Sequence, residues 1–106
     1  MKYIPPKLME EIINRLVHCL QPEKIILFGS HAYGNSAEIS DIDLLIVISD
    51  SDEPRYRRAR KAYSCLRGLT APTELLVLTH KEVQEGAKVY TSLVNQVLQR
   101  GKVLYG

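Results

Sequence analysis

Two acidic residues stand two positions apart at the start of a strongly apolar run. Asp41 and Asp43 lead into residues 44–48, Leu-Leu-Ile-Val-Ile, which is a run of strand length. Side chains at positions i and i+2 of a strand point to the same face, so the two carboxylates should project together. Like charges held side by side repel and require a counter-charge. Hard divalent cations such as Mg²⁺ prefer carboxylate oxygen and share it with substrate phosphates, so the pair is a candidate magnesium site.

A candidate phosphate-binding turn lies upstream, where the apolar run of residues 25–28 stops at Gly29 and Ser30. Glycine permits a tight turn and lets a ligand approach the backbone closely. Residues 30–33 should begin a short helix. Backbone N–H groups at such a turn, together with the serine hydroxyl, can hold phosphates. Alone, Gly-Ser would indicate an ordinary strand-to-helix turn, but the two aspartates downstream favour the phosphate site.

The elements that must position these residues alternate between strands and helices. Apolar runs predict strands over residues 24–28, 41–48 and 72–79, the first of them covered on both faces. Helical spacing predicts helices over residues 6–21, 30–33, 54–66, from 79 to a break at Gly86, and over 90–98. A capping box of Thr79 and Glu82 should start the fourth helix, and Gly101 should end the last one at a C′ position. Three strands separated by helices indicate an α/β domain.

The helix expected over residues 54–66 is rich in basic residues. Tyr56, Ala59, Tyr63 and Leu66 form its expected apolar line, and residues 50–52, Asp-Ser-Asp, could cap its start. The remaining positions carry Arg57, Arg58, Arg60, Lys61 and Arg67. A charged helix face is usually just solvated, which is the favoured interpretation. The functional alternative is a basic surface that meets triphosphate, RNA or an acidic partner.

Length and composition fit one soluble domain spanning residues 1–106. The net charge of +2 gives no strong nucleic-acid signal. Cys19 and Cys65 have no metal-type spacing and are expected to be two reduced thiols. The apolar runs are too short to span a membrane, and the first residues lack the apolar core of a signal peptide. We therefore expect a cytoplasmic protein.

The central stretch of the chain resembles the signature of the DNA polymerase beta-like nucleotidyltransferases. Phe28-Gly29-Ser30, then Gly34, then Ser40-Asp41-Ile42-Asp43-Leu44 match a strand, Gly-Ser, a glycine-containing loop and Asp-x-Asp. The chain looks most similar to minimal nucleotidyltransferases, small one-domain proteins often encoded beside a HEPN-domain partner. This resemblance implies an α/β nucleotidyltransferase fold like the polymerase beta palm, with a small mixed sheet flanked by helices.

The resemblance also implies site residues and cofactors. Asp41 and Asp43 would hold two Mg²⁺ ions, and Glu74, in the third expected strand, would be the third carboxylate of the metal and catalytic set. Relatives more often have aspartate at that third place. Gly29 and Ser30 would hold the β- and γ-phosphates of ATP. Many relatives carry arginine after Gly-Ser, where this chain has His-Ala-Tyr, which removes positive charge near the triphosphate.

The function implied by the resemblance is a Mg-dependent transfer of AMP from ATP to a hydroxyl, a protein adenylyltransferase activity. The acceptor would be a tyrosine of a HEPN-domain toxin, which makes the chain a type VII-like antitoxin. Two alternatives stay open: a non-catalytic antitoxin that neutralises its HEPN partner by contact, and a nucleotide-binding module. The sequence leaves open the acceptor, the preferred base, and whether the chain forms a homo- or hetero-oligomer.

Overall fold

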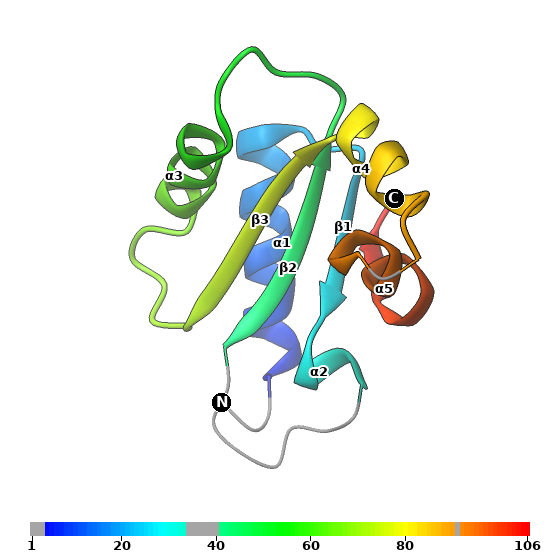
Figure 1. Cartoon of the computed structure of the whole chain (residues 1–106). Helices are drawn as coiled ribbons and strands as arrows, with labels where there is room; N and C mark the ends of the chain where they lie inside the picture. Colours follow the sequence, from blue (N-terminus) through cyan, green and yellow to red (C-terminus); the bar gives the residue numbers. More distant parts are fainter. Residues whose placement is uncertain (1–3, 34–40, 91) are drawn as a thin grey trace.

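A computed structural model describes residues 4–33, 41–90 and 92–106 (Figure 1). The signature residues Gly34 and Ser40 lie outside the described residues. The elements follow one another as α1 (Pro6–Leu20), β1 (Lys24–Phe28), α2 (Ser30–Tyr33), β2 (Ile42–Ile48), α3 (Arg55–Cys65), β3 (Thr73–Thr79), α4 (His80–Ala87), α5 (Leu93–Arg100) and β4 (Lys102–Tyr105). Of the helices in these ranges, none is both long enough and apolar enough to cross a membrane.

The strands form one mixed sheet in the order β3-β2-β1-β4. β1 pairs antiparallel with β2 and with β4, whereas β2 pairs parallel with β3. The mixed α/β sheet expected from the resemblance is therefore confirmed. The fourth strand was not expected, because residues 102–105 are too few to show a strand period of their own. They become a strand by pairing with the free edge of β1.

Both faces of the sheet are covered, as the continuous apolar character of β1 predicts. Ile25 and Leu27 join the core that contains Ile12 of α1 and Ala62 of α3. Ile26, between them in sequence, joins the second core, which contains Leu45 and Leu78 of the sheet and Val97 of α5. Successive side chains of a strand point to opposite faces, so this alternation fixes α1 and α3 on one side of the sheet and α4 and α5 on the other.

The buried side of α3 differs from the expected one. Arg58 and Ala62 are its buried residues, whereas Tyr56 and Tyr63 are 61% and 42% exposed. The expected apolar line was therefore wrong at Tyr56 and Tyr63, although Leu66, its last member, is buried in the core. An acidic partner on α4 accepts Arg58 in the interior instead. The expected cap was also wrong, since α3 starts after Pro54 without a side-chain cap.

The last two helices follow the expected signals more closely. The capping box of Thr79 and Glu82 is present at the start of α4, which ends one residue beyond Gly86. α5 begins only at Leu93, so Tyr90 lies outside it and is 79% exposed. Gly101 ends α5 with extended backbone, φ −72° and ψ 164°, and not with a left-handed cap. The chain turns there directly into β4, against Ile26, where a larger side chain would collide.

The two cysteines form a disulfide, which corrects the expectation of two free thiols. Cys19 lies at the end of α1 and Cys65 at the end of α3, with their Cα atoms 6.1 Å apart. The bond connects residues separated by 46 positions. α1 and α3 pack on the same face of the sheet with these ends side by side, and that proximity is a property of the tertiary fold alone.

Candidate functional site

Two of the three expected carboxylates lie next to each other on neighbouring strands. β2 and β3 pair in parallel with Asp43 opposite Glu74. Leu45 and Leu76, two residues further along each strand, belong to the core beneath α4 and α5. Asp43 and Glu74 therefore point to that same face. Figure 1 shows the starts of β2 and β3 at the end of the sheet where α2 lies.

Asp41 directly precedes β2 and is exposed, whereas Asp43 is half-buried. Burial is the main cause that raises the pKa of the Asp43 carboxyl, and the negative charges of Glu74 and Asp41 raise this pKa further. The His31 side chain of α2 opposes this effect. The three carboxylates are thus close enough to interact, and their mutual repulsion favours a bound cation.

Gly29 stands against the carboxylate of Asp43. Phe28, the last residue of β1, pairs with Asp43, and Gly29 follows with a positive φ of 77°. A Cβ atom at Gly29 would overlap the Asp43 carboxylate. Glycine is therefore required both by the backbone conformation and by the space left beside Asp43. The chain then enters α2 at once, with the N–H of Ala32 donating to the carbonyl of Gly29 at 3.1 Å.

The donors at this end of the sheet suit a hard divalent cation, since they are carboxylate oxygens, and burial together with the charges of Glu74 and Asp41 raises the pKa of Asp43. Within residues 4–33, 41–90 and 92–106, no three His, Cys, Asp or Glu side chains converge on one metal position. Asp43 and Glu74 thus suit Mg²⁺ in donor chemistry and in facing the same way, without forming a three-ligand cluster in this arrangement.

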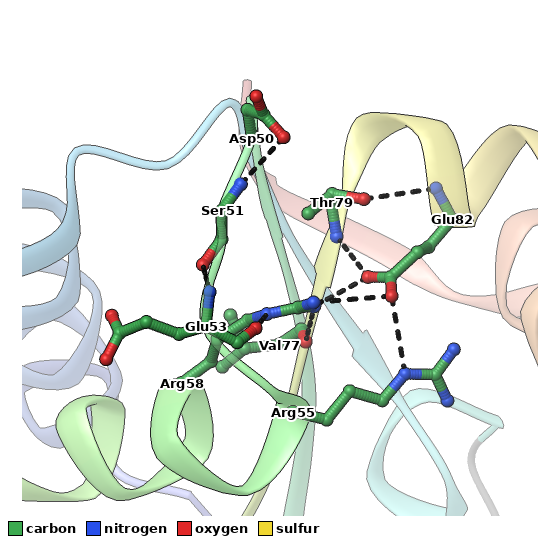
Figure 2. A network of polar contacts seen from close by, with 8 residues as sticks. All are labelled: Asp50, Ser51, Glu53, Arg55, Arg58, Val77, Thr79 and Glu82. Carbon is green, nitrogen blue, oxygen red and sulfur yellow. Dashed lines mark hydrogen bonds and ion pairs between the residues drawn. The ribbon is translucent and has the colours of Figure 1, made fainter.

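A buried ion pair that the sequence interpretation missed lies at the other end of β3 (Figure 2). Arg58 of α3 donates from Nη1 to Oε1 of Glu82 at 2.6 Å and to the Val77 carbonyl at 3.3 Å. The Nε of Arg55 lies 3.5 Å from Oε2 of Glu82. The hydrogen bond from Arg58 is the main cause that lowers the pKa of Glu82 to about 2. The capping box signalled Glu82, but nothing in the sequence singled out Arg58 among its basic neighbours.

Side chains also cover the outer edge of β3. The N–H of Leu75 donates to the Tyr63 hydroxyl at 2.9 Å, and the N–H of Thr79 donates to Oε1 of Glu82 at 2.8 Å. Arg58 also donates to the Val77 carbonyl, so the backbone of residues 75, 77 and 79 is in each case hydrogen-bonded to a side chain. These contacts block addition of another strand and fix the strand that carries Glu74.

Comparisons with known proteins agree with this architecture. A family model described as polymerase beta, nucleotidyltransferase matches residues 10–106. The crystal structure of a candidate nucleotidyltransferase from Sulfolobus solfataricus is 27% identical, with a TM-score of 0.61 over 74% of this chain and 70% of that one. The crystal structure of a second candidate nucleotidyltransferase is 33% identical, with a TM-score of 0.52 over 76% of this chain and 87% of that one. No curated protein is similar enough to match.

Proposed function

The chain belongs to the polymerase beta nucleotidyltransferase family, and on that premise we propose that it transfers AMP from ATP to a protein hydroxyl. The observation that carries the proposal is the pairing of Asp43 with Glu74 across β2 and β3, beside Gly29. This pairing places two carboxylates at one end of the sheet, next to the turn expected to hold phosphates. A purely structural sheet end would gain nothing from like charges placed together.

In the proposed reaction, the acceptor oxygen attacks the α-phosphorus of ATP. A new O–P bond forms, the bond from the α-phosphorus to the bridging oxygen breaks, and pyrophosphate leaves. The carboxylate of Glu74 receives the proton of the acceptor hydroxyl. No covalent enzyme intermediate is needed, because transfer of this kind depends on positioning and on neutralising charge.

Each residue of the site has a proposed role. Asp41, Asp43 and Glu74 would hold two Mg²⁺ ions, which when bound lower the pKa of the attacking hydroxyl and neutralise the triphosphate. The turn at Gly29 and Ser30 would hold the β- and γ-phosphates by its backbone N–H groups. The absence of a side chain at Gly29 leaves the space that the Asp43 carboxylate occupies beside this turn.

The acceptor and the partner are also proposals. A tyrosine of a HEPN-domain toxin is the acceptor that the resemblance favours, so the chain would act as the antitoxin of such a pair in the cytoplasm, where ATP is available. The alternative is an antitoxin, or a nucleotide-binding module, that neutralises its partner by contact without chemistry.

The test compares wild type with Asp43→Asn in calorimetric titrations of Mg-ATP. We expect the variant to bind roughly 10- to 100-fold more weakly, since even residues behind a metal ligand have effects of that size. Asp52→Asn, at an exposed aspartate beyond the far end of β2, is the matched control and should bind normally. Without metal, Asp43→Asn should not lower the free energy of unfolding, because the raised pKa of Asp43 means that its charged form is disfavoured in the folded state.

Equal Mg-ATP affinity in wild type and Asp43→Asn would refute the proposed site. A second experiment distinguishes a catalytic antitoxin from one that acts by contact. The HEPN partner is incubated with labelled ATP and either wild type or the Asp41→Asn/Asp43→Asn variant. Label and an AMP-sized mass increase on the partner should appear with wild type alone. If the double variant still protects cells fully, contact and not catalysis accounts for the biological effect.

A further inference from the structure

The side of α3 that faces away from the sheet combines aromatic and basic side chains. Tyr56 and Tyr63 are 61% and 42% exposed, although helical periodicity predicts that both are buried. Arg60 lies between them, four residues after the first and three before the second, so the three side chains share one side of the helix. Arg58 and Ala62, the buried residues of α3, project from the opposite side. The helix therefore presents two rings and a cation to solvent.

The positive charge of the chain is concentrated on this helix. α3 contains five basic residues and no acidic one, whereas the formal net charge of the whole chain is only +2. Arg57, Arg60 and Lys61 are all exposed. Within residues 4–33, 41–90 and 92–106, none of these three takes part in an ion pair. The outer side of α3 is thus a basic surface whose charges have no acidic partner in the described chain.

Both rings are held by contacts that leave them exposed. The Tyr63 hydroxyl accepts a hydrogen bond from the N–H of Leu75 at 2.9 Å. The central guanidinium carbon of Arg60 lies 5.9 Å from the centre of the Tyr56 ring, within the range of a cation–π contact. A side chain whose position is already fixed loses little conformational freedom when a ligand binds to it. The two tyrosines are therefore preorganised to contact a flat group.

This surface is separate from the candidate carboxylate site. Ala62 of α3 belongs to the core on one side of the sheet, whereas Asp43 and Glu74 point to the other side. Figure 1 shows α3 beside the edge strand β3. The basic residues of α3 consequently do not meet the triphosphate that the carboxylate site is proposed to bind. A nucleic acid and an acidic polypeptide are left as ligands that match the charge.

The arrangement of the side chains favours a single strand of nucleic acid. Each nucleotide carries one negative phosphate and one flat base, so a strand needs both cations and aromatic rings. The acidic side chains of a polypeptide match the cations but offer no flat face to the rings. A rise of about 1.5 Å per residue places Tyr56 and Tyr63 about 10 Å apart along the helix axis. Nucleotides of a duplex strand are only about 3.4 Å apart, so the rings suit bases of an extended, unpaired strand.

We propose that the outer side of α3 binds single-stranded nucleic acid. Tyr56 and Tyr63 stack on two bases, and Arg57, Arg60 and Lys61 bind the phosphates near them. Stacking and phosphate contacts both tolerate any base, so the surface recognises an unpaired strand and not a particular sequence. This inference does not depend on the proposed AMP transfer, since it involves neither the carboxylates nor the phosphate-binding turn.

The test measures binding of a short fluorescein-labelled oligouridylate by fluorescence anisotropy, without ATP or Mg²⁺. Tyr56→Ala should weaken binding about 5- to 100-fold, because the loss of one base stack has an effect of this size. Tyr56→Phe keeps the ring and should bind nearly as well as wild type. The matched control is Tyr90→Ala, at a tyrosine outside α3 that is 79% exposed, and it should bind normally.

Lys61→Gln tests the phosphate contacts. It should lower the affinity and reduce the slope of log affinity against log salt concentration by about 0.7, the value for one phosphate contact on a single strand. Lys81→Gln, at an exposed lysine of α4 on the other side of the sheet, should leave the affinity and the slope unchanged. Urea unfolding of each variant verifies that the fold is intact.

Amide chemical shifts of the ¹⁵N-labelled protein locate the bound strand, and we expect changes at residues 56–64. Changes confined to residues 29–33 and 41–43 would place the strand at the carboxylate site and overturn the inference. No binding to wild type at low salt, or equal affinity of wild type and Tyr56→Ala, would overturn it as well. Tighter binding of polyglutamate, or of a short RNA duplex, than of oligouridylate would show that α3 recognises an acidic polypeptide or paired strands instead.

Discussion

Asp43 is the residue on which the proposed site depends most. Asp43 is half-buried, pairs with Glu74 across the sheet, interacts with the charge of Asp41, and has Gly29 against its carboxylate. A folded chain keeps such a carboxylate charged only where positive charge offsets the burial and the repulsion that raise its pKa. Glu74 differs, because it is exposed and at the start of an edge strand. Its role can therefore be tested without disturbing the core.

Replacing Glu74 with Gln should separate chemistry from binding. If Glu74 takes the proton of the acceptor hydroxyl, the variant should lose about 100-fold or more in kcat, the usual size of general-base effects. Mg-ATP affinity should stay near wild type, because Asp41 and Asp43 would hold the ion that neutralises the triphosphate, whereas Glu74 would complete only the shell of the ion at the attacking hydroxyl. Rates of AMP transfer and calorimetric titrations measure the two quantities, with Glu10→Gln on the exposed side of α1 as control. A Glu74→Gln variant with normal turnover would leave Glu74 as a solvent-facing strand end.

At the scale of elements, β3 is held in place by side chains on its outer side. Tyr63 and Arg58 of α3 and Glu82 of α4 bond to its backbone at alternate residues. Arg58 is only 9% exposed, so its charge is stabilised chiefly by Glu82. One carboxylate thus caps α4, neutralises a buried guanidinium and fixes the end of the strand.

Replacing Glu82 with Gln should lower the free energy of unfolding by about 3 kcal/mol, because it leaves the buried charge of Arg58 without its partner. The folded-state pKa of Glu82 is depressed from 4.5 to about 2. Its stabilising effect is therefore present above pH 4.5 and is lost as the pH falls toward 2. Urea unfolding at neutral pH and within that acid window measures both effects.

In wild type, this acid loss should be larger than in Glu82→Gln, which no longer has the carboxylate. Glu85→Gln, on the exposed side of the same helix, is the control and should behave as wild type. An equal loss of stability with acid in wild type and Glu82→Gln would show that Glu82 does not carry this pH dependence.

At the scale of the whole molecule, the two faces of the sheet differ: one carries the disulfide and the other carries the candidate site. α1 and α3 pack on one face and are joined by the disulfide between Cys19 and Cys65. On the other face, α4 packs near the ends of β2 and β3 remote from Asp43 and Glu74, and α5 packs beside β1 (Figure 1). At the end of this face with the candidate site, Asp41 and Glu74 are exposed and Asp43 is half-buried, so the carboxylates are accessible to ligands.

Reducing the disulfide should lower the free energy of unfolding by about 4 kcal/mol in the chain-entropy model, given its separation of 46 residues. Thermal and urea unfolding with and without dithiothreitol measure this loss. A Cys19→Ser/Cys65→Ser variant should match the reduced wild type and should not respond to dithiothreitol. Identical stability of oxidised and reduced wild type would contradict a stabilising role for the bond.

The sequence by itself determined the features that depend on local spacing. Asp41 and Asp43 at positions i and i+2, the glycine at the end of β1, and the capping box of Thr79 and Glu82 are each set by a few neighbouring residues. The strands β1 to β3 and the mixed α/β architecture followed from apolar runs and from the resemblance. Local rules suffice for these features because the interactions that form them span only a few positions.

Only the tertiary structure decided the features that join distant segments. It placed Glu74 opposite Asp43, paired β4 with β1, buried Arg58 against Glu82, and brought Cys19 to Cys65. Arg58 shows the reason most clearly. Its sequence neighbours are also basic, and helical periodicity treats it as a solvated charge. A carboxylate 24 residues away makes its burial favourable, and no pattern within α3 contains that information.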